Sequence, residues 1–180
     1  MYSSEIIGQE PLKYQLKKMI LLSQAPHCQM FIDSKGFGAL PLALYTALGL
    51  LHGFTTIEKA EDNGTPSKKL LEHPDLHFVF PVVNKGSSSS KAVSDDYKST
   101  WDDFIIRHPY GSTQDWIRQL EAGNKQGMIG VEEVPYYNNA KSLETFRTHL
   151  LTVIEVGFEV SIVTTCEIGK IVKLLDFANR

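Results

Sequence analysis

The 180-residue sequence is poor in cysteine and has no large excess of charge of either sign. Its two cysteines, Cys28 and Cys166, form no CxxC pair, so we expect two reduced, buried thiols rather than a disulfide framework. The net charge of −3 argues against a surface devoted to nucleic acid but allows a local basic patch.

Long apolar runs and targeting signals are also missing. No run reaches the roughly 18–20 apolar residues that span a bilayer. The first residues, MYSSEIIGQE, lack the basic region and apolar stretch of a signal peptide. We therefore expect a cytoplasmic protein with no membrane partner. The remaining composition, 42% hydrophobic and 22% charged, predicts one globular domain with its own core.

Hydrophobic spacing predicts helices that alternate with short strands. The expected helices cover 11–22, 42–51, 94–108, 113–122, 142–156 and 168–177, and the expected strands cover 28–32, 75–83 and 158–165. The helix at 42–51 is apolar nearly all round and should be buried, and Ser94 is expected to be a helix N-cap. Flexible loops are expected at about 53–68 and 84–94. Such alternation predicts an α/β fold with a mostly parallel sheet.

The stretch Phe31–Leu51 has the outline of a phosphate-binding loop, with an apolar strand, a glycine-bearing turn and an apolar helix. The pattern G-x-x-x-x-G-K-[ST] is matched poorly, because Asp33 replaces the first glycine, Ala39 the lysine and Leu40 the hydroxyl. Asp33 should repel phosphate and Ala39 cannot neutralise it. Pro41 removes one N–H donor from the start of the helix. The pattern alone also fits a strand, turn and helix that coincide with the motif by chance.

Other candidate motifs favour structural roles. His73 and His77 are four residues apart, but Pro74 and the strand character of the segment prevent a shared helical face for a metal. An aromatic set at helical spacing is expected in the core rather than as a base-stacking platform. It consists of Tyr97, Trp101, Phe104 and Trp116. A lysine set could bind DNA or form a solvated face, and it consists of Lys13, Lys17, Lys18, Lys68 and Lys69.

Several stretches, in one order, resemble the AAA+ region of subunits of the bacterial DNA polymerase III clamp loader, of the gamma/tau and delta-prime type. They are IIGQEPLKYQLKKMI, APHCQMFID, the loop at 33–39, LEHPDLHFVFPV, VSDDYKSTWDDFIIRHPY, DWIRQLEAGNKQGMIGVEEV and GFEVSIV. HPDLHFVFPV and NKQGMIGVEEV are the most specific and favour the delta-prime type. The resemblance implies a three-layer P-loop-type fold, with a mostly parallel sheet and helices on both faces.

The resemblance also implies positions for a degenerate nucleotide site. Gly8 and Gln9 correspond to the adenine side, and Cys166 and Glu167 to the acidic strand that binds magnesium in relatives. The vestigial phosphate loop comprises Asp33, Ser34, Lys35, Gly36, Phe37, Gly38, Ala39 and Leu40. Loss of both the lysine and the aspartate removes the charge neutralisation on which phosphoryl transfer depends.

The function implied is that of a non-hydrolysing clamp-loader subunit that takes part in sliding-clamp loading during DNA replication. Its partners would be the gamma/tau and delta subunits, with DNA contacted only through the complex. We expect no cofactor: no functional ATP and magnesium site, and no zinc, because 52–72 lacks the cysteines of a zinc module. Residues 1–180 would form one degenerate AAA+ domain, and the lid and collar domains of the family are absent from this sequence.

Two alternatives to this function remain open. One is an interaction module that uses the same scaffold outside the clamp loader. The other is an active ATP-binding protein with a non-standard loop, in which Lys35 contacts phosphate.

Overall fold

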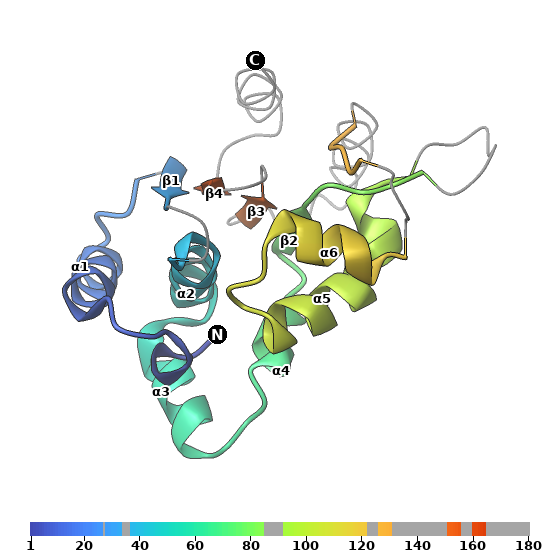
Figure 1. Ribbon diagram of the computed structural model, residues 1–180. Helices are drawn as coiled ribbons and strands as arrows, with labels where there is room; N and C mark the ends of the chain where they lie inside the picture. Colours follow the sequence, from blue (N-terminus) through green and yellow to red (C-terminus); the bar gives the residue numbers. More distant parts are fainter. Residues whose placement is uncertain are drawn as a thin grey trace.

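The computed structural model describes residues 1–26, 28–33, 37–84, 92–121, 126–130, 151–155 and 160–164, the last two ranges as backbone (Figure 1). The described helices are η1 (Ser3–Glu5), α1 (Glu10–Leu21), α2 (Ala39–His52), α3 (Phe54–Asp62), α4 (Lys68–Leu71), η2 (Ser94–Tyr97), α5 (Lys98–Arg107) and α6 (Thr113–Gln119). The described strands are β1 (Cys28–Ile32), β2 (Leu76–Val79), β3 (Leu151–Glu155) and β4 (Val160–Thr164).

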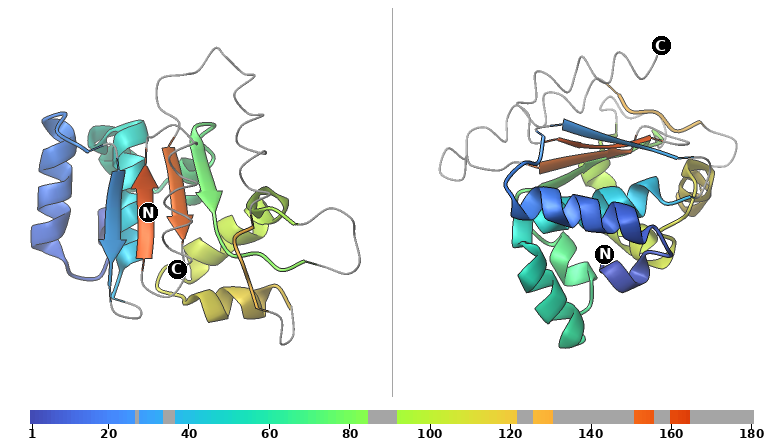
Figure 2. Two further views of the ribbon diagram at one scale, coloured as in Figure 1. Left: turned by 90° about the horizontal axis from the view of Figure 1, so that it is seen from above. Right: turned by 90° about the vertical axis from the view of Figure 1, so that its left-hand side faces the viewer.

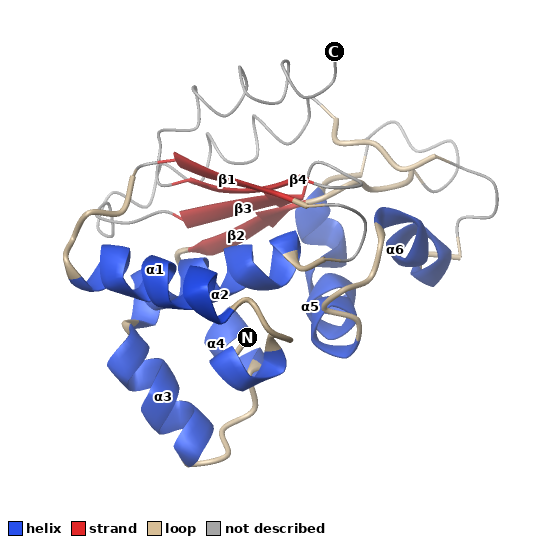
Figure 3. Ribbon diagram, turned by 60° about the vertical axis from the view of Figure 1, so that its left-hand side comes forward, coloured by secondary structure: helices blue, strands red, loops and turns tan. Residues whose placement is uncertain are grey.

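The four described strands form one sheet in the order β1-β4-β3-β2. β2 and β3 are parallel, whereas β4 runs antiparallel to both of its neighbours, β1 and β3. The described helices lie on one face of this sheet (Figure 2, Figure 3). The described sheet is therefore mixed rather than mostly parallel, and these residues do not show a three-layer arrangement with helices on both faces.

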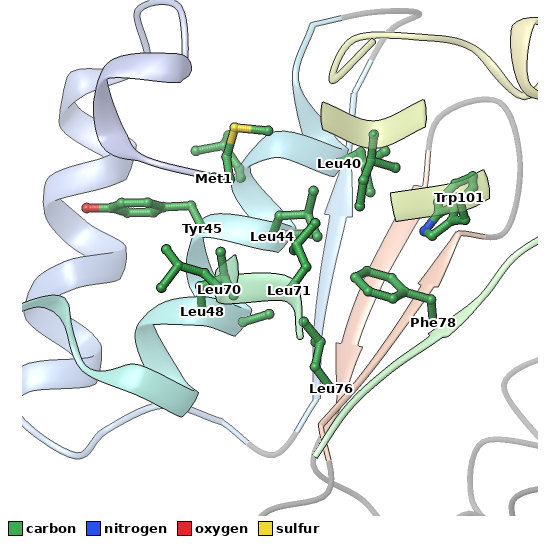
Figure 4. Close-up of a cluster of buried hydrophobic side chains, with 14 of the residues drawn as sticks. Met1, Leu40, Leu44, Tyr45, Leu48, Leu70, Leu71, Leu76, Phe78 and Trp101 are labelled. Atoms are coloured by element: carbon green, nitrogen blue, oxygen red, sulfur yellow. The ribbon is translucent and has the colours of Figure 1, made fainter. Parts of the chain in front are cut away.

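Helix α2 forms the centre of the core, as its all-round apolar sequence predicts. Every residue from Ala39 to Gly49 is buried, and the helix contacts β1, β3 and β4 on one side and α1 and α3 on the other. Figure 4 shows Leu44 and Leu48 of α2 among buried side chains from the N-terminus, α4 and β2. A helix enclosed in this way needs no polar face.

Helix α3 lies where the sequence predicted a loop over 53–68, and this prediction is wrong. Phe54 and Ile57, three residues apart, are both buried and give α3 its inner face. Gly53 adopts φ 74°, which allows the chain to turn by 105° between α2 and α3. A Cβ at Gly49 would lie 2.4 Å from Phe54 Cζ, so glycine is required there for the aromatic ring to pack.

Strand β3 replaces part of the helix predicted over 142–156. Leu151–Glu155 pairs with β2 on one side and β4 on the other. Thr152, Val153 and Ile154 are consecutive β-branched residues and are suited to an interior strand, although their apolar spacing also fits a helix. The rest of that predicted helix, the helix at 168–177 and most of the predicted loop at 84–94 lie outside the described residues.

Two further predictions are corrected by the structure. Ser94 is not an N-cap: its hydroxyl accepts a hydrogen bond from Phe80 N–H at 3.0 Å and donates to Phe80 O at 3.1 Å. This exchange ties the start of η2 to the end of β2. Cys28 is exposed rather than buried, because it lies on the side of β1 that faces away from the described helices.

Among the described helices, none alone is both long and apolar enough to cross a membrane. Only α2 and α3 taken together reach such a length, and the bend between them measures 105°.

Candidate functional site

The predicted strand and helix are present on either side of the segment that the resemblance assigns to a phosphate loop. β1 ends at Ile32, α2 begins at Ala39, and Gly38 precedes the helix with φ 109°, a left-handed conformation that favours glycine. Ser34, Lys35 and Gly36 lie outside the described residues. The local path of the chain thus provides a helix N-terminus next to a strand end, the backbone element that binds phosphate in other proteins.

The N-terminus of α2 already holds a carboxylate from its own chain. Asp33 Oδ2 accepts a hydrogen bond from Ala39 N–H at 2.7 Å. A negative charge is stabilised there because the helix dipole and the first N–H groups carry partial positive charge. Asp33 therefore does more than repel an incoming anion, since its own carboxylate occupies a donor that a phosphate would use.

Two other positions in the first turn offer no donor either. Leu42 N–H donates to Gly38 O at 3.1 Å, closing the first helical turn. Pro41 has no N–H group. Together with Ala39, these residues make three of the first four positions of α2 unavailable to an external phosphate, whose binding depends on several converging N–H groups.

The side chains at the lysine and hydroxyl positions of the motif lie inside the protein. Ala39 is 7% exposed and Leu40 8%. Leu40 lines a small cavity together with Trp101 and Trp116, and Figure 4 shows it in the apolar core. An ammonium or hydroxyl group at these positions would be buried among apolar side chains, so the loop differs from a working one in geometry as well as in residue type.

Tyr110 connects the loop with the segment that the resemblance assigns to the adenine side. A Cβ placed on Gly38 would lie 3.3 Å from Tyr110 Cε1, so the phenol ring lies directly against this glycine. The Tyr110 hydroxyl accepts a hydrogen bond from Ile7 N–H at 2.8 Å. Gly8 and Gln9 follow with φ 66° and 60° and lead into α1.

Tyr110 therefore contacts both predicted parts of the site. Its ring lies against Gly38 of the phosphate-type loop, and its hydroxyl binds Ile7, next to the segment assigned to the adenine side. Sequence analysis did not identify Tyr110. The only signal near it is the turn-forming Pro109 and Gly111, which predicts a loop but not the segment that the loop contacts.

Strand β4 ends at the edge of the sheet opposite to the one from which the phosphate-type loop leaves. Cys166 and Glu167 lie outside the described residues, but β4 ends at Thr164, which pairs with Cys28 at the start of β1. The phosphate-type loop follows Ile32, at the other end of β1. The start and the end of β1, Cys28 and Ile32, are four residue steps apart, or about 13 Å. The two residue steps from Thr164 to Cys166 can extend at most about 7 Å. If β4 ran parallel to β1, the carboxyl ends of the two strands would lie at the same edge of the sheet.

The lysine set predicted as an alternative DNA surface is divided by the fold. Lys13 is 5% exposed, and its Nζ lies 3.3 Å from both Ser3 O and Ile6 O and 2.5 Å from Glu10 Oε1. Lys17 pairs with Glu58, and Lys68 Nζ lies 2.5 Å from Asp103 Oδ1. The hydrogen bond from Lys68 lowers the pKa of the Asp103 carboxyl. Three of the five lysines therefore have acidic partners within the fold.

The described histidines do not form a metal site with acidic neighbours. His73 Nδ1 accepts from Asp75 N–H at 3.1 Å, and its ring meets that of His52 edge to face at 5.0 Å. Burial lowers the pKa of His77. Within the described part of the chain, no three His, Cys, Asp or Glu side chains are placed to hold a metal ion.

Comparison with known proteins gives no relative: no family model, no curated protein and no solved structure matches this chain.

Proposed function

We propose that this chain is a non-hydrolysing, delta-prime-type subunit of a DNA polymerase III clamp loader, located in the cytoplasm. Its role would be to present a rigid surface to the gamma/tau and delta subunits while they load the sliding clamp. It would contact DNA only through the complex and would need neither nucleotide, magnesium nor zinc. The assignment to this assembly rests on the sequence resemblance alone.

The observation that supports the absence of nucleotide chemistry is the hydrogen bond from Ala39 N–H to the Asp33 carboxylate. A phosphate oxygen would have to displace this carboxylate, and it would also meet the remaining negative charge of Asp33. The donors lost at Pro41 and Leu42, and the buried Ala39 and Leu40, leave no compensating group among the first four residues of α2.

Titration calorimetry with ATP and magnesium tests this part of the proposal. We expect no heat of binding for the natural chain at millimolar ATP. Asp33→Gly, which restores the first glycine of the motif and removes the carboxylate, should still bind weakly or not at all, because Ala39 and Leu40 remain. Micromolar binding by the natural chain that Lys35→Ala abolishes would instead establish the active ATP-binding alternative.

Reconstitution tests the assembly. Purified delta and gamma/tau subunits should form a stable complex with the full-length protein, and the complex should load a clamp on primed DNA. Omission of this protein should stop loading, and Asp33→Gly should not affect it. Failure to enter the complex would remove the clamp-loader assignment and leave the calorimetric result unchanged.

The second candidate is an interaction module outside the clamp loader, and the direction of β4 favours it. An antiparallel neighbour of β1, with its end at the edge away from the loop, differs from the parallel arrangement that the resemblance implies. The reconstitution above separates the two candidates, since an interaction module of another assembly would bind neither delta nor gamma/tau.

A further inference from the structure

A tight turn at the start of β2 is held by one histidine. His73 O accepts a hydrogen bond from Leu76 N–H at 3.0 Å, and His73 Nδ1 accepts one from Asp75 N–H at 3.1 Å. Pro74 follows His73, and its ring fixes φ at a value that suits this position of a turn. His73 therefore binds both backbone N–H groups at the end of the turn.

The hydrogen bond from Asp75 N–H defines the protonation state of the His73 ring. A ring nitrogen accepts a hydrogen bond only while it carries no proton, so the ring is neutral and its proton is on Nε2. A second proton on Nδ1 would turn this atom from an acceptor into a donor. Asp75 N–H would then lose its partner. Because histidine ordinarily changes charge between about pH 5 and pH 8, this hydrogen bond depends on pH.

The side chain of Asp75 offers a partner for the protonated ring. Asp75 Oδ2 lies 3.9 Å from His73 Nδ1, beyond hydrogen-bond distance but close enough for a small rotation of the carboxylate to bring the atoms together. The two side chains are 24% and 27% exposed, so protons from water reach both. Asp75 thus provides a donor for the neutral ring and an acceptor for the charged one.

His52 orients the His73 ring. His52 Nε2 lies 2.9 Å from Leu70 O, and a carbonyl oxygen only accepts, so this nitrogen carries a proton. The rings of His52 and His73 meet edge to face with centroids 5.0 Å apart. His52 is the last residue of α2, and Leu70 belongs to α4. Contacts with two helices therefore hold the ring in the position from which it binds the turn.

The charged groups around the turn favour Asp75 as the partner of a protonated His73. Among the described residues, Asp75 is the only carboxylate within ion-pair distance of either ring. Glu72 precedes His73 and is exposed. Burial lowers the pKa of His77, the second residue of β2, and the charges of Asp95 and Asp75 oppose this shift. A proton on His73 therefore has its nearest opposite charge on Asp75.

We propose that the His73 turn is a pH-sensitive switch at the start of β2. With a neutral ring, Nδ1 accepts the hydrogen bond from Asp75 N–H. With a protonated ring, Nδ1–H donates to the Asp75 carboxylate and Asp75 N–H is released to water. The turn leads directly to Leu76, which is buried in the core and pairs with Leu151 of β3. The switch therefore acts at the point where the chain enters the sheet.

Nuclear magnetic resonance of the ¹⁵N-labelled full chain, from about pH 8 to about pH 5, tests the proposal. At high pH the ring nitrogens of His73 should show the Nε2–H tautomer. As the pH falls, the Asp75 amide signal should change with the same midpoint as the His73 ring. His73→Asn is the informative variant, because an asparagine oxygen also accepts from the N–H two residues on but does not titrate. Its Asp75 amide should stay bound at every pH.

Asp75→Asn tests the second state of the switch. Without the carboxylate, the midpoint of His73 should fall by roughly half a pH unit, since the protonated ring loses its opposite charge. The matched control is Asp62→Asn, at the exposed end of α3, which should leave the midpoint unchanged. Circular dichroism should show that all variants remain folded. An Nδ1–H tautomer at high pH, an Asp75 amide that does not follow the His73 ring, or an unchanged midpoint in Asp75→Asn would overturn the proposal.

Discussion

The aromatic cluster and the N-terminal cap both hold buried residues, but by opposite means. The aromatic cluster consists of Phe78, Phe80, Trp101, Phe104 and Trp116, beneath the β2 end of the sheet. The N-terminal cap is residues 1–6 with the groups that bind them from α1, from α3 and from the segment 65–67 that precedes α4. One depends on apolar contact, and the other on matched charges and hydrogen bonds.

Ring contacts determine the packing of the aromatic cluster. Trp101 stacks on Phe80 with centroids 4.2 Å apart and meets Trp116 edge to face at 5.0 Å. Trp116 Nε1–H donates to Pro81 O at 2.8 Å, which satisfies its buried polar group. Ionisable groups contact only the periphery of the cluster, with Lys98 Nζ 5.7 Å from the Phe78 ring centroid and the His108 ring 5.6 Å from that of Phe104, so the cluster should be less sensitive to pH and salt than the N-terminal cap.

Polar contacts determine the packing of the N-terminal cap. Met1 and Tyr2 are buried, the Met1 α-amino nitrogen lies 3.8 Å from Glu5 Oε2, and the Tyr2 hydroxyl donates to Thr65 O at 2.6 Å. Ser67 Oγ donates to Glu5 Oε1 at 3.0 Å. Lys13 adds its bonds to Ser3 O and Ile6 O. Each buried polar group here depends on its partner, so this region should respond to charge and pH.

The largest effect should come from the aromatic cluster. Trp116→Ala should lower the free energy of unfolding by about 3–5 kcal/mol, through lost burial and the cavity that remains. Urea denaturation followed by circular dichroism measures this. Tyr14→Ala, at an exposed aromatic, should stay within about 0.5 kcal/mol. Equal losses in the two variants would mean that the cluster contributes no special packing.

Loss of the buried lysine should have the next largest effect. Lys13→Met keeps the apolar stem but leaves Ser3 O and Ile6 O without their ammonium donor, at a cost of about 2–3 kcal/mol. Lys18→Met, on the exposed face of the same helix, should change stability by no more than about 0.5 kcal/mol. The same denaturation measurement compares them, and an unchanged midpoint for Lys13→Met would contradict the importance of the cap.

The pH dependence should separate the two regions. Burial lowers the pKa of the Met1 α-amino group to about 6 from its usual 8.0. Between these values the unfolded chain binds a proton that the folded chain does not, so stability should rise with pH from 6 to 8, by about 2 kcal/mol. For a chain that begins with Met1, thermal melting at several pH values measures this. An N-acetylated chain should lack most of the slope, and an equal slope in both would assign it to other groups.

The smallest effect on stability should come from Asp33, in the loop that precedes α2. Asp33→Asn keeps an acceptor for Ala39 N–H but removes the charge that the α2 dipole stabilises, so the loss should be about 0.5–1 kcal/mol. Because the pairing is electrostatic, the difference between the natural chain and the variant should shrink as salt is raised. Denaturation at low and high salt checks this, and a salt-independent difference would point to altered backbone geometry instead.

Local sequence predicted the elements whose pattern is strong and left the ambiguous ones open. The helix after Gly38 and the strand CQMFI have unambiguous apolar patterns and are confirmed. In Leu151–Glu155 the apolar spacing fits both a helix and a strand, and pairing with β2 and β4 makes it a strand. In α3 most residues are polar, and the single three-residue spacing of Phe54 and Ile57 was too short a pattern to predict a helix.

The candidate site shows the same limit. The sequence identified Asp33 and Pro41 as obstacles to phosphate, but it could not show that the Asp33 carboxylate binds Ala39 N–H. Nor could it place Tyr110 between Gly38 and Ile7, because those residues are far apart in the chain. Such contacts depend on tertiary packing, for which a single sequence contains no local signal.

The sequence by itself determined which segments are apolar enough to be buried and which residues of a phosphate loop are absent, because both depend on residue type and local spacing. Only the tertiary structure decided that β4 runs antiparallel to β1, so that its end and the loop leave the sheet at opposite edges. Strand direction is set by pairing between segments that are distant in the chain. The same apolar pattern fits a strand that runs in either direction.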